Sequence, residues 1–349
     1  MASQIWKEQY ESERDHLLEA LGRVTDGGII ESIQHIGATS VPGIQGFPCV
    51  DIGLAVWPFP FEAGPKSRLE ALGYQIVDGF TESLQQQRFR HESGSFQLFI
   101  FEPGIGDWYD FVLVGDYLRH NDAARDDVSA KKSNAALDKS VLFAELLPNA
   151  HQWWIDHYGF TPLDAVTNEL KEASFPWFIA GGWTLELLAG RLQRVHHDVD
   201  VIIPRHSQFE LQKYLLARDW KSITPFEKRL ESWPPHMRLE LRRHQVHAHR
   251  GDDFIDFLIT DIHEVWRYRR EPLIIRALER MSLSTESGIP YLAPELVLLF
   301  KSRNTGNNER AKDQTDFERT LPHLEPERRA WLRWALTATA PDHPWISQL

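Results

Sequence analysis

The sequence predicts an α/β (α+β) protein made of two mixed-sheet domains, each with a helical C-terminal appendage. A chain of 349 residues is too long for one ordinary hydrophobic core and fits two. In each half, strand-like and helix-like runs alternate first, and helical sequence follows. Both halves also contain glycines followed by aspartate in an apolar run, at residues 35–56 and 179–205. We therefore expect one domain at residues 1–165 and a second at residues 166–349.

In the first half, helical sequence at residues 11–24 stops at Gly27 and Gly28, which favour a break in the helix. Apolar runs then predict strands at residues 29–37, 49–57 and 95–102, and a helix followed by a strand at 68–77. From residue 107 to about residue 158 the pattern is amphipathic and predicts helices.

The second half repeats this order. Residues 176–182 predict a strand that leads into a turn, and residues 183–190 predict a helix. Further runs predict a strand at 198–204, a helix at 207–220 and paired strands at 237–250 and 254–261. From Ala293 onward the sequence is helical.

Composition limits the class of protein. Hydrophobic residues make up 42% and charged residues 25%, as in ordinary globular proteins. No apolar run approaches the roughly 20 residues of a membrane span, so we expect no membrane partner. The single cysteine, Cys49, and a polar N-terminus unlike a signal peptide lead us to expect a cytoplasmic protein. A net charge of −12 disfavours nucleic acid as a partner without excluding it.

Two aspartates in the run DVDVIIP predict a metal site. Asp198 and Asp200 are separated by one residue, so in a strand their carboxylates project to the same side, roughly 6–7 Å apart. A divalent cation relieves the repulsion between them, and Mg²⁺ favours carboxylate and phosphate oxygens. The preceding His196 and His197 leave two alternatives open, a phosphate contact or packing at the surface.

Gly181 and Gly182 precede a helix that we expect to begin at Trp183. Glycine lets the backbone approach a ligand closely, and a helix N-terminus favours phosphate. Asp256, in the strand-like run FIDFLITD, is expected to complete the metal site or to act as the general base toward an attacking hydroxyl. A phosphate site beside a metal site is what nucleotide-dependent phosphoryl or nucleotidyl transfer requires.

The second half also resembles a known family. The run IAGGWTLELLAGRLQRVHHDVDVIIPR, followed by WRYRREP, SGIPYLAPELVLLFKSR and KDQTDFE, resembles the aminoglycoside 2''-adenylyltransferase-like branch of the nucleotidyltransferase superfamily. This resemblance extends from about Phe175 to His343. It implies a polymerase-beta-like fold and the transfer of a nucleoside monophosphate, AMP from ATP or its equivalent from another NTP, to a substrate hydroxyl.

The same resemblance implies roles for individual residues. By it, Gly181 and Gly182 cradle phosphate, Asp198 and Asp200 bind Mg²⁺, Asp256 is the third acid and the general base, and Lys301 lies near the triphosphate. One difference from the usual pattern is that Gly182 stands where a serine commonly follows the first glycine.

The first half resembles another branch of this superfamily, the GrpB family (UPF0157), through HIGATSVPGIQGFPCVDIGLAV and FEPGIGDWYDFVLVGDYLRHNDAARDDVSAKKSNAA. Gly37 precedes Asp51 by 14 positions, much as Gly182 precedes Asp198 by 16, which aligns Asp51 with the first acid. Gly53 then stands at the second-acid position, and Gln97 lies in the strand that should carry the third acid. We therefore expect a degenerate nucleotidyltransferase-like domain with a binding, regulatory or stabilising role.

Together these observations predict a Mg²⁺-dependent nucleotidyltransferase that uses ATP or another NTP. The expected acceptor is a hydroxyl of a small polar molecule such as an aminoglycoside, which would make the protein an antibiotic-resistance factor. Two alternatives stay open: transfer to tRNA or protein, as in toxin-like relatives, and a non-catalytic nucleotide-binding or regulatory protein. A basic channel beside Asp198 would favour tRNA, and an acidic open cleft would favour an amino sugar.

Overall fold

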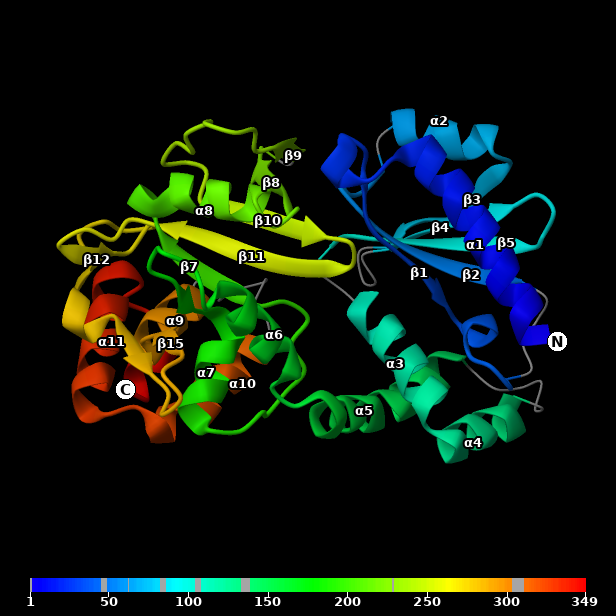
Figure 1. Ribbon diagram of the computed structural model, residues 1–349. Coiled ribbons are helices and arrows are strands. Elements are labelled where there is room, and N and C mark those ends of the chain that lie inside the picture. Colours follow the sequence, from blue (N-terminus) through cyan, green and yellow to red (C-terminus); the bar gives the residue numbers. More distant parts are fainter. Residues whose placement is uncertain are drawn as a thin grey trace. The chain divides into compact units, whose positions relative to one another are not determined.

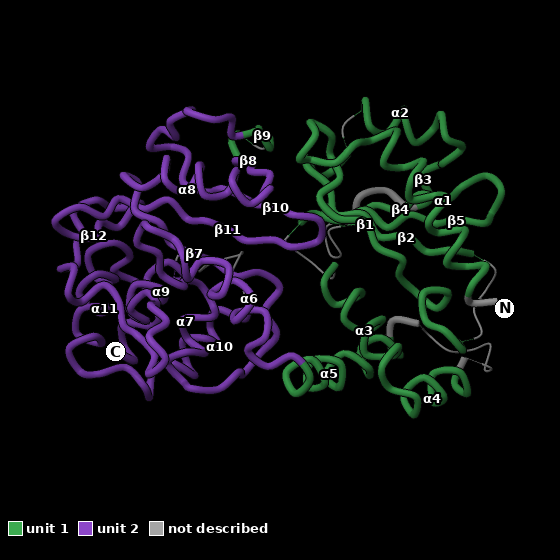
Figure 2. The backbone as a smooth tube through the Cα atoms, in the orientation of Figure 1, with its two compact units in different colours: residues 1–157, 225–232 green, residues 158–224, 233–349 purple. Residues whose placement is uncertain are grey.

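The computed structural model describes residues 2–44, 49–61, 63–81, 86–103, 108–132, 139–227, 229–302 and 311–349. Two compact units are present, coloured separately in Figure 2. Unit 1 comprises Met1–His157 with Pro225–Ser232, and unit 2 comprises Tyr158–Thr224 with Trp233–Leu349. Both contain a mixed sheet with helices (Figure 1), so the predicted fold class is confirmed. The boundary at residues 165 and 166 stays a prediction.

Unit 1 is built on a five-stranded sheet in the order β1-β2-β5-β4-β3. Its strands are β1 (Ile30–Ile36), β2 (Val50–Val56), β3 (Tyr74–Thr81), β4 (Gln86–His91) and β5 (Phe96–Phe101). Its helices are α1 (Ala2–Leu21), α2 (Ala63–Ala71), α3 (Trp108–His120), α4 (Asp122–Lys132) and α5 (Lys139–Tyr158). Strand β4 was not predicted, because its sequence QQRFRH lacks an apolar alternation.

The two faces of strand β2 have different partners. Val50, Ile52 and Leu54 belong to the core that includes leucines of α1 and α2. Ala55 instead packs in a cluster with Trp108 at the start of α3. Because side chains of a strand alternate between faces, Asp51 lies on the same face as Ala55.

Unit 2 contains most of an eight-stranded sheet in the order β14-β15-β6-β7-β11-β10-β8-β9. The strands of this sheet are β6 (Phe178–Ile179), β7 (Asp200–Pro204), β8 (Lys221–Phe226), β9 (Arg229–Ser232), β10 (Gln245–Arg250), β11 (Asp253–Thr260), β14 (Ser282–Ser284) and β15 (Pro290–Leu292). A separate pair is formed by β12 (Val265–Arg267) and β13 (Ile275–Ala277). The helices are α6 (Thr161–Leu170), α7 (Gly181–Ala189), α8 (Gln208–Leu216), α9 (Pro294–Lys301), α10 (Ala311–Thr320) and α11 (Pro326–Thr339).

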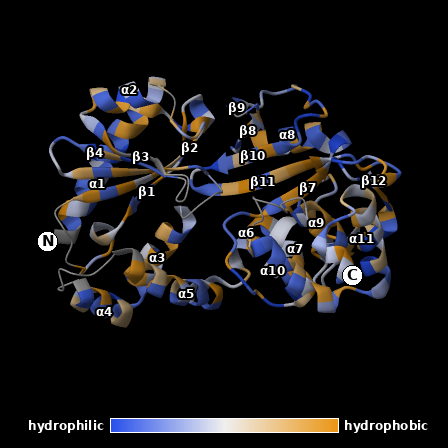
Figure 3. Ribbon diagram, turned by 180° about the vertical axis from the view of Figure 1, so that it is seen from behind, coloured by the Kyte–Doolittle hydropathy of each residue, from blue (hydrophilic) through white to orange (hydrophobic). Residues whose placement is uncertain are grey.

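The main core of unit 2 lies between the sheet and its C-terminal helices. Ile202 of β7 packs there with Leu296 of α9 and Leu332 of α11. Helices α7, α9, α10 and α11 lie on one side of the sheet and α8 on the other (Figure 1). Strands β7 and β11 are coloured as hydrophobic over most of their length in Figure 3, as central strands should be. Among the described residues, no helix combines the length and apolar character needed to cross a membrane.

One predicted strand is shorter than expected. Residues 237–250 alternate like a strand, but β10 begins at Gln245. The buried guanidinium of Arg205 donates to the backbone carbonyls of Leu239, Glu240 and Arg243, with distances of 3.2–3.4 Å. These carbonyls are therefore committed to a side chain, and the segment is irregular.

Both units share one arrangement of five strands. In unit 1, β1 is antiparallel to β2, β2 is parallel to β5, and β4 and β3 continue antiparallel. In unit 2, β6, β7, β11, β10 and β8 follow in the same order with the same relative directions. The repeated pattern makes β2 the counterpart of β7, and β5 the counterpart of β11.

A buried charge cluster fixes the C-terminal helices of unit 2. Glu295, with no exposed surface, accepts from Arg276 at 2.7 and 3.2 Å. Arg328 of α11 donates to both oxygens of the same carboxylate, at 2.7 and 2.9 Å. One carboxylate thus balances two buried guanidinium groups.

We predict that Glu295→Gln lowers the free energy of unfolding by about 3–5 kcal/mol, because it removes the buried carboxylate that Arg276 and Arg328 share. Only the more exposed Glu327 and Glu325 then remain as their counter-charges. Urea unfolding measures the change. Glu172→Gln is the control, since Glu172 is 71% exposed where it pairs with Arg218 and should contribute less than about 1 kcal/mol. Equal effects of the two substitutions would contradict the prediction.

Candidate active site

Asp198 and Asp200 lie at the start of β7, beside Asp256 of the parallel strand β11. The register of β7 and β11 pairs Asp200 with Asp256. Such partners point to the same face, with about 4.8 Å between the strands. The N–H of Asp256 donates to the carbonyl of Val199 at 3.2 Å, which holds residues 198–199 beside β11. Asp198 was expected inside the strand but precedes it, because the ladder pairing with β11 begins at Asp200.

The electrostatics of this cluster favour a cation. Loss of solvation, followed by the negative charge of Asp198, raises the pKa of Asp200 to about 7. The positive charges of Lys301, Lys312 and Arg194 oppose the shift, so these groups act on the same carboxylate. Neighbouring carboxylates repel each other when both are ionised, and a divalent cation between them removes this repulsion. Carboxylate oxygens are also the ligands that Mg²⁺ prefers. The described residues therefore fit the metal that the sequence predicted.

Gly181 is in close contact with this cluster. Its φ is +58°, and a Cβ built there would lie 1.8 Å from Oδ2 of Asp200. Its neighbour Ala180 donates its N–H to the carbonyl of Asp200 at 2.8 Å. Only glycine satisfies both the backbone conformation and the missing space. Helix α7 begins at this residue, two positions before the predicted start at Trp183.

Gly182 is needed for a different reason. A Cβ at this position would lie 2.2 Å from Nη2 of Arg194 and 2.4 Å from Cε1 of His196. Two side chains from the loop before β7 therefore cover the first turn of α7. Sequence reasoning did not identify Arg194, although its position four residues before Asp198 was visible.

Lys301 is held by ion pairs at the end of α9. Its Nζ lies 2.7 Å from Asp313 and 2.8 Å from Asp316, both on α10. Asp316 also accepts two hydrogen bonds from Arg194, at 2.9 and 3.1 Å. Burial opposes the ionisation of Asp316, but Arg194 and Lys301 hold its pKa below the usual value. The only sequence signal for this cluster was the spacing of Asp313 and Asp316 on one helix face.

His196 packs inside unit 2. Its Nε2 lies 3.0 Å from Oε1 of Glu186, and its ring stacks on Trp183 with 4.6 Å between centroids. Burial lowers the pKa of His196 well below its ordinary value and raises the pKa of Glu186 to about 7. Burial therefore favours the uncharged forms of both side chains. The pair packs beside Gly182 and supports the wall of the site. For this histidine the sequence left a phosphate contact or packing at the surface open. The contacts agree with packing, but His196 is buried inside the unit.

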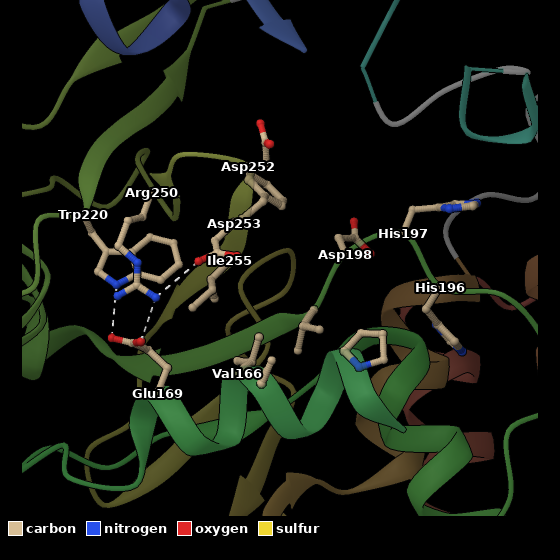
Figure 4. A pocket seen from close by; sticks show the side chains of 14 residues that line it. Val166, Glu169, His196, His197, Asp198, Trp220, Arg250, Asp252, Asp253 and Ile255 are labelled. Atoms are coloured by element: carbon tan, nitrogen blue, oxygen red, sulfur yellow. Dashed lines mark hydrogen bonds and ion pairs between the residues drawn. The ribbon is translucent and has the colours of Figure 1, made fainter. Parts of the chain in front are cut away.

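A cavity of about 300 Å³ adjoins Asp198. Asp198 and His197 lie at one end of it, and Glu169, Arg250 and Trp220 at the other (Figure 4). Arg250 donates to Glu169 at 3.0 Å. The remaining lining residues are Pro162, Ala165, Val166, His196, Val199, Asp252, Asp253, Phe254 and Ile255. The lining carries more carboxylates than guanidinium groups, so it favours a cationic ligand.

Unit 1 repeats the glycine–carboxylate contact. Gly37 has a φ of +71°, and a Cβ there would lie 2.4 Å from Oδ2 of Asp51. The register of β2 and β5 pairs Asp51 with Gln97, as β7 and β11 pair Asp200 with Asp256. Asp51 therefore corresponds to the second acid of unit 2, and Cys49, two residues earlier, corresponds to the first.

This correspondence corrects the alignment made from sequence spacing, which matched Asp51 to the first acid and Gly53 to the second. The spacing misled because the nine residues of α7 begin at the glycine in unit 2, whereas the described residues directly after Gly37, Ala38–Ser40, form a single 3₁₀ turn in unit 1. Gly53 has another role, since a Cβ there would lie 2.5 Å from the ring of Trp108. Among the described residues at these three positions, only Asp51 carries a carboxylate.

Comparison with known protein families gives one match in each half of the chain. A model of the GrpB protein family matches residues 2–145. A model described as aminoglycoside-2''-adenylyltransferase matches residues 162–319. The first half thus resembles GrpB and the second half resembles adenylyltransferases, as the sequence motifs indicated.

Individual relatives cover parts of the chain. A UPF0157 protein of Streptomyces coelicolor is 31% identical over 114 residues, which are 33% of this chain and 56% of that protein. The crystal structure of GrpB from Enterococcus faecalis aligns with 42% of this chain and 92% of its own, at 21% identity and a TM-score of 0.37. The crystal structure of ANT(2'')-Ia in complex with adenylyl-2''-tobramycin aligns with 52% of this chain and 98% of its own, at 14% identity and a TM-score of 0.37.

We predict that Gly181→Ala destabilises unit 2 by about 1–3 kcal/mol through its backbone conformation alone, and further by displacing the carboxylate of Asp200. Mg²⁺ binding, measured by calorimetry, should fall in parallel. Gly190→Ala is the matched control, because Gly190 has a φ of +67° with nothing within 4 Å of its Cβ position. The prediction is wrong if Gly181→Ala and Gly190→Ala lose the same stability and both bind Mg²⁺ as the wild type does.

Proposed function

We propose that unit 2 is a Mg²⁺-dependent nucleotidyltransferase that moves a nucleoside monophosphate, AMP from ATP, onto a hydroxyl of a small polar acceptor. The observation that carries this proposal is the pairing of Asp200 with Asp256 on parallel strands, with Gly181 against the Asp200 carboxylate. Metal-binding acids beside the N-terminus of a nine-residue helix suit a nucleotide triphosphate. The description of the matching family model supports the same activity.

In this proposal Asp256 takes the proton of the acceptor hydroxyl. The hydroxyl oxygen forms a bond to the α-phosphorus, the bond from that phosphorus to the bridging oxygen breaks, and the electron pair leaves with pyrophosphate. Gln245 donates to Oδ2 of Asp256 at 2.5 Å and so orients the carboxylate. Mg²⁺ held by Asp198 and Asp200 would supply charge stabilisation for the phosphates.

An amino sugar such as an aminoglycoside is the proposed acceptor. The cavity beside Asp198 includes Glu169, Asp252 and Asp253 against one arginine, Arg250. Its charge suits ammonium groups and disfavours the phosphate backbone of tRNA. Mass spectrometry of an aminoglycoside panel incubated with the protein, ATP and Mg²⁺ tests the proposal. Labelling of tRNA or protein without any modified aminoglycoside would favour the toxin-like alternative.

Asp200→Asn should abolish Mg²⁺-dependent release of pyrophosphate, because the site loses a metal ligand at its centre. Asp51→Asn is the matched control: it changes the counterpart carboxylate of unit 1, which lies outside the proposed site, and should leave the rate within about twofold. Pyrophosphate release at saturating ATP measures both. Activity that survives in Asp200→Asn, or disappears in folded Asp51→Asn, would reverse the roles given to the two units.

Asp256→Asn should lower kcat by roughly 10²–10⁴, which is the usual contribution of a positioned general base. Titration with Mn²⁺ separates the two functions considered for this residue. Retained Mn²⁺ binding with lost turnover identifies a base, whereas loss of both identifies a metal ligand. Unchanged turnover in the folded variant would exclude both functions.

A further inference from the structure

Phe254 lies between the acidic cavity and Asp256. Among the described residues, Phe254 belongs to the lining of the cavity beside Asp198, and Asp256 does not. Phe254 and Asp256 are two residues apart in β11, so their side chains project to the same face, roughly 6–7 Å apart. An acceptor in the cavity therefore has to extend along Phe254 before one of its hydroxyls reaches Asp256.

Two imidazole rings pack against the ring of Phe254. Strand β10 pairs His249 with Phe254 and His247 with Asp256, so both histidines lie on the face that carries Asp256. The ring centroid of Phe254 is 5.1 Å from that of His249 and 5.5 Å from that of His247, with interplanar angles of 53° and 74°. Tilted and edge-on contacts are favourable between aromatic rings, so they hold the half-buried Phe254 in one orientation. We call Phe254, His247 and His249 the aromatic platform.

His247 adds a polar atom to this platform. The residue is only 7% exposed, and its Nδ1 has no hydrogen-bond partner among the described residues. A buried polar atom without a partner is costly, and a bound molecule that bonds to it removes the cost. Because His247 is the register partner of Asp256, such a bond would be made next to the hydroxyl that Asp256 deprotonates.

The surroundings define the chemistry of a ligand that fits here. A sugar ring has faces of C–H groups and a polar rim, so aromatic side chains suit its face and a buried nitrogen suits its rim. The carboxylates of Glu169, Asp252 and Asp253 in the adjoining cavity attract ammonium groups. A flexible polyamine would satisfy these carboxylates but would offer no flat face to Phe254.

We propose that the aromatic platform is the subsite for a six-membered ring of an amino sugar, with Phe254 packed against its face and Nδ1 of His247 bonded to a substituent beside the attacking hydroxyl. Phe254 is then a specificity-determining residue that selects acceptors with rings, and His249 is a positioning residue that holds it. This inference rests on the proposed function, because it names how that site recognises its acceptor.

Calorimetry on the full chain tests the platform with two polycations, tobramycin and spermine, in Mg²⁺ with and without α,β-methylene-ATP. Both carry several ammonium groups, but only tobramycin has sugar rings. Phe254→Leu should weaken tobramycin binding roughly 3- to 10-fold, the usual value of a ring contact beyond its buried area, and leave spermine binding within about twofold. Phe254→Tyr, which keeps the ring, should lie closer to the wild type. Phe209→Leu is the control, since Phe209 is on α8 and 44% exposed.

The two histidines are separated by substitutions that keep a ring. His247→Phe removes the nitrogens and should weaken tobramycin binding roughly 3- to 10-fold, as the loss of a neutral hydrogen bond does, without changing spermine binding. His249→Ala should also weaken tobramycin binding selectively, and His249→Phe should restore it, because the role of His249 depends on its ring. Melting temperatures show which variants are folded, and Phe254→Met replaces Phe254→Leu if that variant is not.

The outcomes separate this inference from the proposed function. Equal losses of tobramycin and spermine binding in Phe254→Leu, or no loss of either, overturn the platform and leave the proposed activity in place. A selective loss of tobramycin binding, together with no modified aminoglycoside, supports the platform and removes the proposed activity. A wild-type protein that neither binds nor modifies tobramycin overturns the platform, and one that modifies no member of the aminoglycoside panel overturns the proposed acceptor as well.

Discussion

The site of unit 2 depends on a contact without room for a side chain, between the backbone of Gly181 and the carboxylate of Asp200. It brings the first turn of α7 against the start of β7, and the pairing with β11 then places Asp256 beside Asp200. A helix N-terminus and a group of acids are opposite in charge, so each stabilises the other's position. The first turn of α7 and the acid cluster therefore present opposite charges side by side.

Charges of both signs lie around this contact. Asp200 lies against Gly181, and Arg194 lies against the next residue, Gly182. The positive charges of Arg194 and Lys301 act on the Asp200 carboxylate. Asp316 then balances these cations from α10. Such alternation keeps each buried charge next to an opposite one, without which the desolvation of so many ions would destabilise the fold. The C-terminal helices are thus part of the site as well as its support.

Sequence patterns predicted what depends on local periodicity. The strands that carry Asp200 and Asp256 were foreseen because their apolar residues alternate or run continuously. The partnership of Arg194 and Asp316 was not, because 122 residues separate them and nothing in either segment indicates the other. The counterpart of Asp51 was misassigned for a related reason. Spacing counts residues, whereas the position of an acid is set by strand register, which insertions in the intervening helix do not change.

The glycine contact of unit 1 is present without the acids that accompany it in unit 2. Gly37 keeps the backbone conformation that admits a carboxylate at Asp51, so the scaffold of that position persists. Cys49 and Gln97 stand where unit 2 has Asp198 and Asp256. At these three positions the two halves therefore differ in two side chains, which are carboxylates only in unit 2. The contact between a glycine backbone and a carboxylate therefore does not require the other two acids, and a metal site needs more than this local geometry.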